Sequence, residues 1–467
     1  MMTGRTLFDK IWDAHVVRDL GSGWALLHID RHLLHDLSGS ASLSEMAERG
    51  LAVHDPDLVF ATPDHAVSTR PGRDGMTYVA GSKLWSALRQ GAKQFGIRLF
   101  DLGEKGQGIV HVMGPEQGIV LPGLTMICGD SHTCTNGALG ALALGVGSSE
   151  STHALATQTL RLQRPRHMRI RCEGILAPGV TAKDLALHII GTLGADAGVG
   201  HAIEYAGSTI EALDVEARLT LCNLTVELGA RSGVIAPDDR TFDYVKGRRF
   251  APQGADFDAA VAAWRELKTD ADAVFDREEF IDACLVAPTV TWGTSPEHAI
   301  AIDARIPDPR GETGLNADAI AQALDYMGLD AGAPIAGTPI DWVFIGSCTN
   351  SRLSDLRAAA DIARGRHIAP NVRAWVVPGS EDVKRAAEAE GLHEVFAAAG
   401  FEWREPGCGM CVAANGEQVP PKARCVSTSN RNFVGRQGPQ ARTHLASPAM
   451  AVAAALTGRL SDVRALA

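Results

Sequence analysis

Trp342-Val343-Phe344-Ile345 is a short apolar run, and the polar loop Gly346-Ser347-Cys348-Thr349-Asn350-Ser351 follows it directly. The residues from Leu353 to Ala363 carry apolar side chains at helical spacing, and Ala374-Trp375-Val376-Val377 is the next apolar run. Alternation of short apolar runs with helical segments predicts a βαβ series and therefore a parallel sheet. Ligands of such sheets bind at the carboxyl ends of strands, so Cys348 is expected at the binding edge.

The same alternation extends over most of the chain. Further helices are predicted near Glu381, over His393 to Ala399 and over Leu445 to Leu456. Toward the N-terminus the pattern recurs in four apolar runs, each followed by a polar or glycine-bearing loop: Ala25 to Ile29, Leu58 to Ala61, Ile109 to Val112 and Leu124 to Cys128. A middle block opens with alternating Met168 to Cys172 and contains a helix that Thr181 starts.

These elements predict an α/β protein with three doubly wound domains. We place the first at residues 1–165, the second at 166–290 and the third at 291–467. A single hydrophobic core rarely serves a chain of 467 residues, which agrees with several domains. The stretch 306–340, rich in Pro, Gly and Asp, is expected to be a connecting loop around one helix, Ala317 to Met327.

Composition excludes two classes of protein. Hydrophobic residues make up 45% of the chain and charged residues 21%, and no run approaches the roughly 18 apolar residues of a membrane span. The net charge of −11 argues against a general nucleic-acid surface, which needs a basic face. The N-terminal stretch from Met1 to Leu7 lacks the apolar core of a secretory signal, so we expect a cytoplasmic protein.

The nine cysteines are an odd number, which in a reducing compartment favours free thiols and metal ligation over a disulfide framework. Core packing is the ordinary role of a free cysteine, and we expect it for those in or beside strand-like runs: Cys172, Cys222, Cys284 and Cys425. Cys348, Cys408 and Cys411 lie instead in loops rich in Gly, Pro, Asn and Ser.

These three cysteines suggest an iron-sulfur site. Three thiolates on a four-iron cluster leave one iron open, and an open iron acts as a Lewis acid on a substrate rather than as an electron store. A structural zinc site would need a fourth ligand at comparable spacing, and none stands near. A thioredoxin-like redox pair would leave Cys348 unexplained.

The chain resembles, over nearly its whole length, the large subunits of 3-isopropylmalate dehydratase, a family in the aconitase superfamily. Besides both cysteine elements, the matching stretches are Thr6-Leu7-Phe8-Asp9-Lys10, Gly108-Ile109-Val110-His111-Val112-Met113-Gly114-Pro115-Glu116-Gln117-Gly118, Gly129-Asp130-Ser131-His132-Thr133, Val290-Thr291-Trp292-Gly293-Thr294 and Ser427-Thr428-Ser429-Asn430-Arg431-Asn432-Phe433-Val434-Gly435-Arg436.

The resemblance implies three aconitase-type α/β domains around one 4Fe-4S cluster held by Cys348, Cys408 and Cys411. It implies a hydro-lyase that interconverts 2-isopropylmalate and 3-isopropylmalate by dehydration and rehydration, as in leucine biosynthesis. Such chemistry needs a base for a C–H proton, an acid for the departing hydroxyl and cations for two carboxylates.

The resemblance also assigns roles to residues. The implied catalytic residues are Asp64, His65, His111, Asp130, His132 and Glu227. Ser131, Arg431 and Arg436 are the implied substrate contacts, with His35 and Asp36 near expected substrate positions. Arginine suits a carboxylate because it donates two parallel hydrogen bonds. Asn223, Asn350 and Asn430 are implied donors to the cluster sulfurs, a contact that tunes a metal centre.

The resemblance further implies a partner. In single-chain aconitases a further domain carries the catalytic base, and this chain ends soon after the helix at 445–456. We therefore expect a separate small subunit that supplies a swivelling domain and the base, in a heterodimer that is active only when complete.

Two departures from the family pattern concern the substrate. Asp36 stands where glutamate is usual, and Asn136 stands where histidine is usual. They leave room for a related hydro-lyase acting on citramalate, citraconate or another small 2-substituted malate. An aconitase-type RNA-binding regulator would be expected to have lost cluster cysteines or acid-base residues, and all are retained here. A pure electron-transfer protein is the third class, which a redox titration insensitive to substrate would favour.

Overall fold

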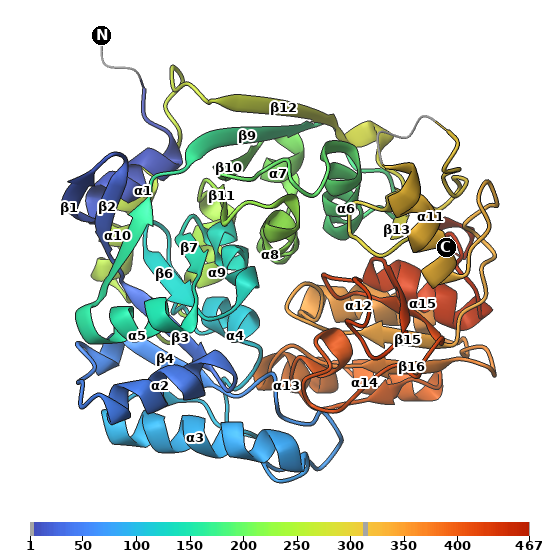
Figure 1. Ribbon diagram of the computed structural model, residues 1–467, viewed down its shortest axis with the longest axis horizontal. Helices are drawn as coiled ribbons and strands as arrows, with labels where there is room; N and C mark the ends of the chain where they lie inside the picture. The colour runs from blue at the N-terminus through green and yellow to red at the C-terminus, as the bar shows by residue number, and fades with distance from the viewer. Residues whose placement is uncertain (1–3, 312–315, 467) are drawn as a thin grey trace. The chain divides into compact units, whose positions relative to one another are not determined.

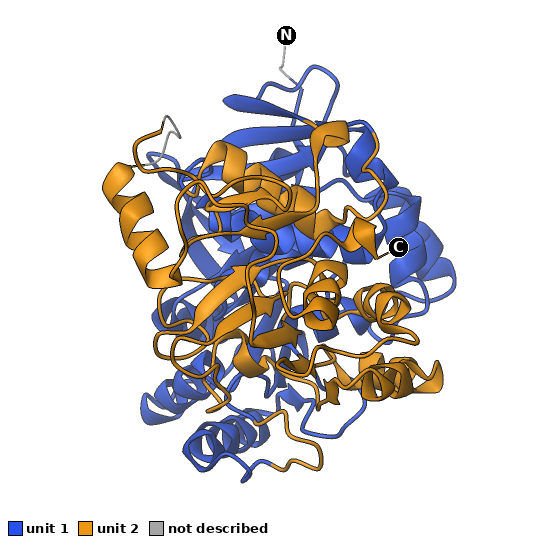
Figure 2. Cartoon of the chain, turned by 90° about the vertical axis from the view of Figure 1, so that its right-hand side faces the viewer, with its two compact units in different colours: residues 1–67, 75–174, 196–281 blue, residues 68–74, 175–195, 282–467 orange. Residues whose placement is uncertain are grey.

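The computed structural model describes residues 4–311 and 316–466, and it is drawn in Figure 1. The chain forms two compact units, coloured separately in Figure 2. Unit 1 comprises residues 1–67, 75–174 and 196–281, and unit 2 comprises residues 68–74, 175–195 and 282–467. Residues 312–315, inside the predicted connecting loop, lie outside the described residues.

The main sheet of unit 1 is parallel and has the strand order β5-β4-β3-β6-β7. Its strands are β3 (Arg31–His35), β4 (Val59–Thr62), β5 (Arg98–Leu99), β6 (Thr125–Cys128) and β7 (Leu142–Gly145). The helices that follow these strands are α2 (Ser38–Glu48), α3 (Val79–Phe95), α4 (Val110–Glu116) and α5 (Ser148–Thr157). Helices α2 and α3 run side by side in Figure 1, with a core of Leu34, Leu43 and Leu88 beneath α2.

Unit 1 contains two further sheets. The first has the order β11-β10-β9-β12, with β9 (Arg166–Glu173), β10 (His201–Ala206), β11 (Ser232–Ile235) and β12 (Arg277–Asp282, whose last residue belongs to unit 2). The second is antiparallel, with β1 (Val16–Gly21), β2 (Trp24–His28) and β8 (Thr159–Gln163). The accompanying helices are α1 (Leu7–His15), α7 (Ser208–Ala212), α8 (Val215–Asn223), α9 (Asp239–Val245) and α10 (Ala255–Trp264).

Unit 2 contains one five-stranded parallel sheet of order β17-β16-β15-β18-β19. Its strands are β15 (Trp342–Ile345), β16 (Arg373–Val376), β17 (Glu402–Trp403), β18 (Arg424–Ser427) and β19 (Arg442–Leu445), and a small antiparallel pair is formed by β13 (Thr289–Thr291) and β14 (Ala299–Ala301). The helices are α6 (Ala182–Leu193), α11 (Ala317–Met327), α12 (Leu353–Ala363), α13 (Glu381–Ala389), α14 (Leu392–Ala398) and α15 (Pro448–Thr457).

Local sequence explains where several of these elements begin and end. Thr6 starts α1 and Thr181 starts α6 through capping boxes, in which the Asp9 and Asp184 carboxylates accept the backbone N–H of the capping residue. All four residues of β15 are buried, as expected of a central strand covered on both faces. Gly458 ends α15 in the left-handed conformation that glycine tolerates.

The predicted α/β class with parallel sheets is confirmed. The predicted strand Trp342 to Ile345 and helices Leu353 to Ala363 and Ala317 to Met327 match β15, α12 and α11. One apolar run was misjudged, because Val110–Glu116 is helix α4 rather than a strand. The final helix begins at Pro448, since Arg442–Leu445 forms strand β19. Among the described residues, no helix combines the length and apolar character needed to cross a membrane.

Candidate active site

Three neighbouring strands of the main sheet of unit 1 deliver acidic and histidine side chains to one edge. In β3 and β4, His35 pairs with Thr62, and in β3 and β6, Leu33 pairs with Cys128. The strands are parallel, so their carboxyl ends coincide and the loops after them lie together. These loops carry Asp36, Asp64-His65 and Asp130-Ser131-His132, all predicted as site residues.

Asp64 and His65 form a buried pair. Asp64 Oδ1 shares a hydrogen bond with His65 Nδ1, and Asp64 Oδ2 accepts the backbone N–H of Val110 at 3.0 Å. The opposite ring nitrogen, His65 Nε2, lies 3.1 Å from Asp130 Oδ2. A carboxylate at Nδ1 therefore orients the imidazole and leaves Nε2 to exchange a proton.

His35 and Asp36 lie behind this pair and are buried. The ring of His35 stacks on that of His65, with centroids 4.4 Å apart. Asp36 accepts the backbone N–H groups of His65 at 3.0 Å and Ala66 at 2.7 Å. Ligand atoms of His35, Asp36, Asp64 and His65 all lie within 4.8 Å of one another. Asp36 therefore fixes the loop that carries His65.

Asp130 is the centre of a second group of side chains. Its Oδ2 faces His65, and its Oδ1 lies 3.5 Å from His111 Nε2 and 3.5 Å from His132 Nδ1. His132 Nε2 lies 2.9 Å from Glu227 Oε1, and the Ser131 hydroxyl is exposed beside it. A Cβ on Gly129 would lie 1.9 Å from Ser38 Oγ, so only glycine fits immediately before Asp130. The structure thus brings all the predicted catalytic residues of unit 1 together.

Charges within this cluster shift the proton affinities of its carboxylates. Burial alone would raise the pKa of Asp130, but hydrogen bonds from His111, His132 and His65 hold that pKa well below its usual range. Burial likewise opposes ionisation of Asp64, yet the charge and hydrogen bond of His65 lower its pKa. Burial and the neighbouring charge of Asp64 raise the pKa of Asp36. Asp64 and Asp130 are therefore the ionised partners of the histidines.

Asn136, the second departure from the family pattern, is buried, as Asp36 is. Asn136 Nδ2 lies 3.2 Å from His111 Nδ1 and donates to the Thr133 carbonyl at 3.0 Å. Asn223, predicted as a donor to cluster sulfurs, donates to Thr135 Oγ1 at 2.8 Å. Cys134 is fully buried beside it, with Sγ 3.6 Å from the Asn223 carbonyl. Asn136 orients a histidine, and Cys134 is part of the surrounding core.

Unit 2 holds the three predicted cluster cysteines, and all are buried: Cys348, Cys408 and Cys411 are 5–6% exposed. Cys348 follows β15, Cys408 directly precedes a 3₁₀ turn, η5 (Gly409–Cys411), and Cys411 is the last residue of that turn. Asn430 joins the two elements, because its Nδ2 donates to Cys348 Sγ at 3.3 Å and its Oδ1 lies 3.6 Å from Cys411 Sγ. Cys284, predicted in the core, is exposed.

The loop that carries Cys348 is strained and firmly held. Ser347 has φ 88°, a left-handed value that costs a residue with a side chain about 1–3 kcal/mol. The Thr428 hydroxyl, at the end of β18, accepts the Gly346 N–H and donates to the Gly346 carbonyl, both at 2.9 Å. Asn350 donates to Asp355 at 2.9 Å. A strained backbone that surrounding hydrogen bonds hold in place is typical of functional loops.

The donor set fits a multi-iron cluster better than a single ion. Thiolates on one zinc ion, with Zn–S bonds of about 2.3 Å, would lie about 3.8 Å apart. Within residues 4–311 and 316–466, the three cysteines do not form a group whose ligand atoms all lie within 4.8 Å of one another. Asn430 contacts two of these sulfurs, and sulfurs farther apart than one ion requires suit a larger inorganic core.

Sequence reasoning missed a lysine beside these cysteines. Lys183, on α6, is fully buried and donates to the carbonyls of Ser429 at 2.5 Å and Thr428 at 3.2 Å. Burial lowers its pKa to about 8, and the charges of Cys411 and Cys348 oppose that change. The signal was a lysine and an aspartate, Asp184, in the apolar stretch of a predicted helix, where charged residues are rarely buried without a partner.

Arg431 and Arg436 lie in the loop after β18 and are half-buried. Arg436 stacks over Phe433, with its guanidinium carbon 5.4 Å from the ring centroid. The side chains between the two arginines, Phe433 and Val434, are 48% and 60% exposed. The predicted residues thus fall into two groups: the His, Asp, Ser and Glu residues with Asn223 in unit 1, and the Cys and Arg residues with Asn350 and Asn430 in unit 2.

Comparisons with known proteins address the whole chain. Residues 9–458 match the Aconitase family (aconitate hydratase). The chain is 63% identical over 464 residues to 3-isopropylmalate dehydratase large subunit 1 of Bradyrhizobium diazoefficiens, covering 99% of this chain and 97% of that protein. Aconitase X of Thermococcus kodakaraensis, a crystal structure of the holo-form, superposes with a TM-score of 0.47 and 13% identity over 90% of this chain and 86% of that one. The resemblance seen in the sequence is confirmed: this chain belongs to the aconitase family.

Proposed function

We propose that this protein is the large subunit of a hydro-lyase that interconverts 2-isopropylmalate and 3-isopropylmalate by removing and re-adding water, as in leucine biosynthesis. The observation that carries the proposal is the Asp64-His65-Asp130 arrangement in a chain so similar to a 3-isopropylmalate dehydratase large subunit. The same chemistry would serve the alternative substrates citramalate and citraconate. The unusual Asp36 and Asn136 do not favour them, because both side chains are buried behind His65 and His111.

The residues of unit 1 carry out the proton transfers in this proposal. His65, oriented by Asp64, gives the Nε2 proton to the departing hydroxyl, which leaves as water. Asp130, His111, His132 and Glu227 hold that water for re-addition at the neighbouring carbon. Ser131 is exposed and able to contact substrate directly, whereas His35 and Asp36 act on it through His65.

In unit 2, Cys348, Cys408 and Cys411 would hold a 4Fe-4S cluster, and Asn430 would donate to its sulfur ligands together with Asn350. When bound, the cluster supplies a Lewis acid that polarises the leaving hydroxyl. Arg431 and Arg436 bind the substrate carboxylates in this proposal, with guanidinium groups suited to bidentate contact.

We also propose a small-subunit partner that supplies the base for the C–H proton. The name of the Bradyrhizobium relative designates a large subunit. Exposed Phe433 and Val434, between the two arginines, offer an apolar contact for such a partner.

A cytoplasmic location is consistent with nine free cysteines. The three large sheets fall in residues 1–165, 166–290 and 291–467 and support the proposed three domains.

The proposal is tested by assaying the anaerobically reconstituted chain with and without the small subunit encoded beside it. We expect turnover of 2-isopropylmalate in the mixture, little turnover by either subunit alone, and slower turnover of citramalate and citrate. Formation of the unsaturated intermediate is followed by its ultraviolet absorbance. Full activity of the large subunit alone, or preference for citrate, would contradict the proposal.

Two cysteine variants provide a matched control. Cys348→Ser removes a proposed ligand, so its protein should lack the visible absorbance of the cluster and lose turnover. Cys284→Ser alters an exposed thiol of the same unit and should keep both. A Cys348→Ser protein that retains the wild-type iron content and spectrum would remove Cys348 from the ligand set.

A further inference from the structure

A cavity of about 480 Å³ opens in unit 1 among α1, β2, β7 and β8, and none of the residues that line it is a site residue named above. Its apolar wall follows from helix and strand periodicity. Phe8 and Trp12 share one face of α1 at i and i+4, and Leu142 and Leu144 share one face of β7 at i and i+2. These side chains belong to a buried core cluster and are at most 5% exposed. A volume of this size is typical of small-molecule sites.

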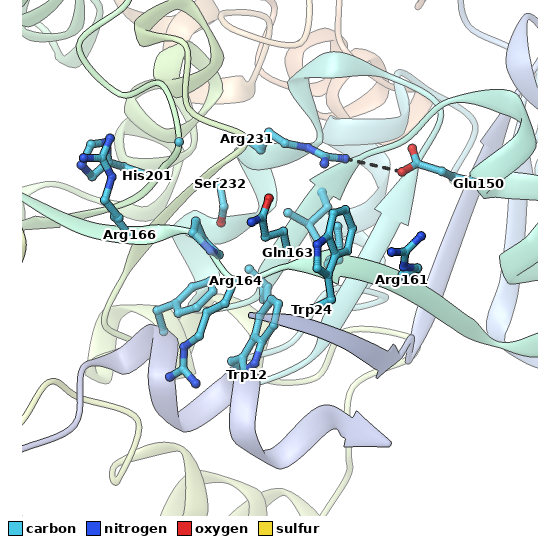
Figure 3. A pocket seen from close by; sticks show the side chains of 16 residues that line it. Trp12, Trp24, Glu150, Arg161, Gln163, Arg164, Arg166, His201, Arg231 and Ser232 are labelled. Carbon is cyan, nitrogen blue, oxygen red and sulfur yellow. Dashed lines mark ion pairs between the residues drawn. The ribbon is translucent and has the colours of Figure 1, made fainter. Parts of the chain in front are cut away.

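A buried hydroxyl in the cavity wall has no hydrogen-bond partner. Ser232, at the start of β11, is 2% exposed, and among the described residues nothing bonds its Oγ. Leaving such a group unsatisfied is unfavourable, so a wall hydroxyl of this kind is suited to a polar atom that enters the cavity. Gln163 places a carboxamide in the same space, as Figure 3 shows.

The charged residues that line the cavity are mostly cations. Four arginines line it against one acid, Glu150, in a chain whose net charge is −11. In Figure 3, Arg166 and His201 lie at one end of the view and Arg161 and Glu150 at the other. Their positive field also acts on His201, whose pKa is lowered by burial and by the charge of Arg166.

Two of the arginines are committed to neighbours, and two are available to a ligand. Arg164 pairs with Asp9 at 2.5 Å, and Arg231 lies 4.0 Å from Glu150. Arg161 stacks on Trp24 at 4.2 Å, which leaves the N–H groups in the plane of its guanidinium for an anion. Within the described part of the chain, no carboxylate lies within 4.0 Å of a nitrogen of Arg161 or Arg166.

We propose that this cavity is a second binding site, for a small carboxylate with a branched aliphatic or aromatic body. The body packs against Phe8, Trp12, Leu142 and Leu144, and the carboxylate bonds to Arg161 or Arg166 at the rim. The hydroxyl of Ser232 donates to a polar atom of the ligand. This site is independent of the proposed active-site chemistry.

The test uses isothermal titration calorimetry of the full chain, with its cluster rebuilt, against 4-phenylbutanoate. We expect one molecule bound per chain. The matching amide, 4-phenylbutanamide, should bind roughly tenfold or more weakly because it lacks the charge, and inorganic sulfate should bind weakly because it lacks the body.

Variants locate the binding. Arg161→Gln with Arg166→Gln should weaken binding about tenfold, and Ser232→Ala, which removes one oxygen and keeps the shape, severalfold. Leu144→Phe, which fills the cavity, should also weaken binding of the probe and so checks the location independently of the arginines. Arg240→Gln, on exposed α9 outside the cavity, is the matched control and should bind as the parent does.

Three outcomes would overturn the proposal: no heat with the probe, equal binding of the amide, or equal binding by the arginine double variant. Loss of probe binding when the small subunit is added would also overturn it, because the cavity would then be a subunit contact.

Discussion

At the scale of single residues, Asp64 has both carboxylate oxygens engaged. One oxygen bonds to His65 and the other accepts the Val110 N–H. Asn at this position keeps the size of the side chain but removes the charge that stabilises a protonated His65. We expect Asp64→Asn to lower kcat by about 10²–10⁴, as loss of an oriented acid does, with a smaller change in KM. Steady-state assays of the complete enzyme measure both constants.

The control for this prediction is Asp243→Asn, at an exposed position on α9. It makes the same chemical change and should leave kcat unaltered. Both variants should show the parent's circular dichroism and iron content. An Asp64→Asn enzyme with the parent kcat would mean that His65 does not depend on this carboxylate.

Residue types explain why much of the site could be predicted. Asp64-His65 and Asp130-Ser131-His132 follow apolar runs, so their place in loops after strands could be predicted from strand periodicity, whereas their roles in a site were implied by the family resemblance. Asn136 and Lys183 could not be assigned in that way. Asn136 contacts His111, which is 25 positions away in the sequence, and Lys183 bonds to Ser429, which is 246 positions away. No local sequence pattern encodes such contacts.

At the scale of elements, α6 brings an ammonium group to the loop that precedes Asn430. Lys183→Met should leave the Thr428 and Ser429 carbonyls without this donor and cost about 1–3 kcal/mol of stability. It also removes a positive charge near Cys348 and Cys411, so the reduction potential of a bound cluster should become more negative. Redox titration followed by electron paramagnetic resonance measures that shift.

Lys83→Met, at an exposed position of α3, is the matched control for the lysine variant and should change neither property. An unchanged potential in Lys183→Met, in protein with full iron content, would show that the ammonium serves packing alone.

The elements also show where periodicity fails. Ile109 to Val112 is apolar throughout, and four such residues suit a buried strand as well as the start of a buried helix. The chain continues as α4 because Asp64 accepts the Val110 N–H at the helix start, a contact made by a residue 46 positions away. The last helix was predicted to begin at Leu445, which is the final residue of strand β19, because only its pairing with β18 identifies Arg442–Leu445 as a strand.

At the scale of the whole molecule, stability should decline in mild acid. His32 in unit 1 and His444 in unit 2 are fully buried, and burial lowers the pKa of each to about 3. Their ordinary pKa in an unfolded chain is about 6.5, so between these values the unfolded state binds more protons. Each histidine therefore removes about 1.4 kcal/mol of stability as the pH falls from about 7.5 to 5.5. Urea unfolding at a series of pH values measures this slope.

His32→Gln should flatten that slope, whereas His153→Gln, at an exposed position, should not. Equal slopes in the parent and both variants would place the acid sensitivity in other groups.

Each unit consists of three segments that are separated in the sequence, and this affects folding during synthesis. Lys183 leaves the ribosome 245 residues before the Thr428 carbonyl that it bonds, which at roughly 5–20 residues per second is about 12–50 s of translation. Strand β15 is likewise synthesised well before β18, the strand with which it pairs in the middle of the sheet. A nascent chain must therefore keep α6 from aggregating until the last tenth of the protein has been synthesised, which makes it a natural client for chaperones that shield apolar segments during synthesis.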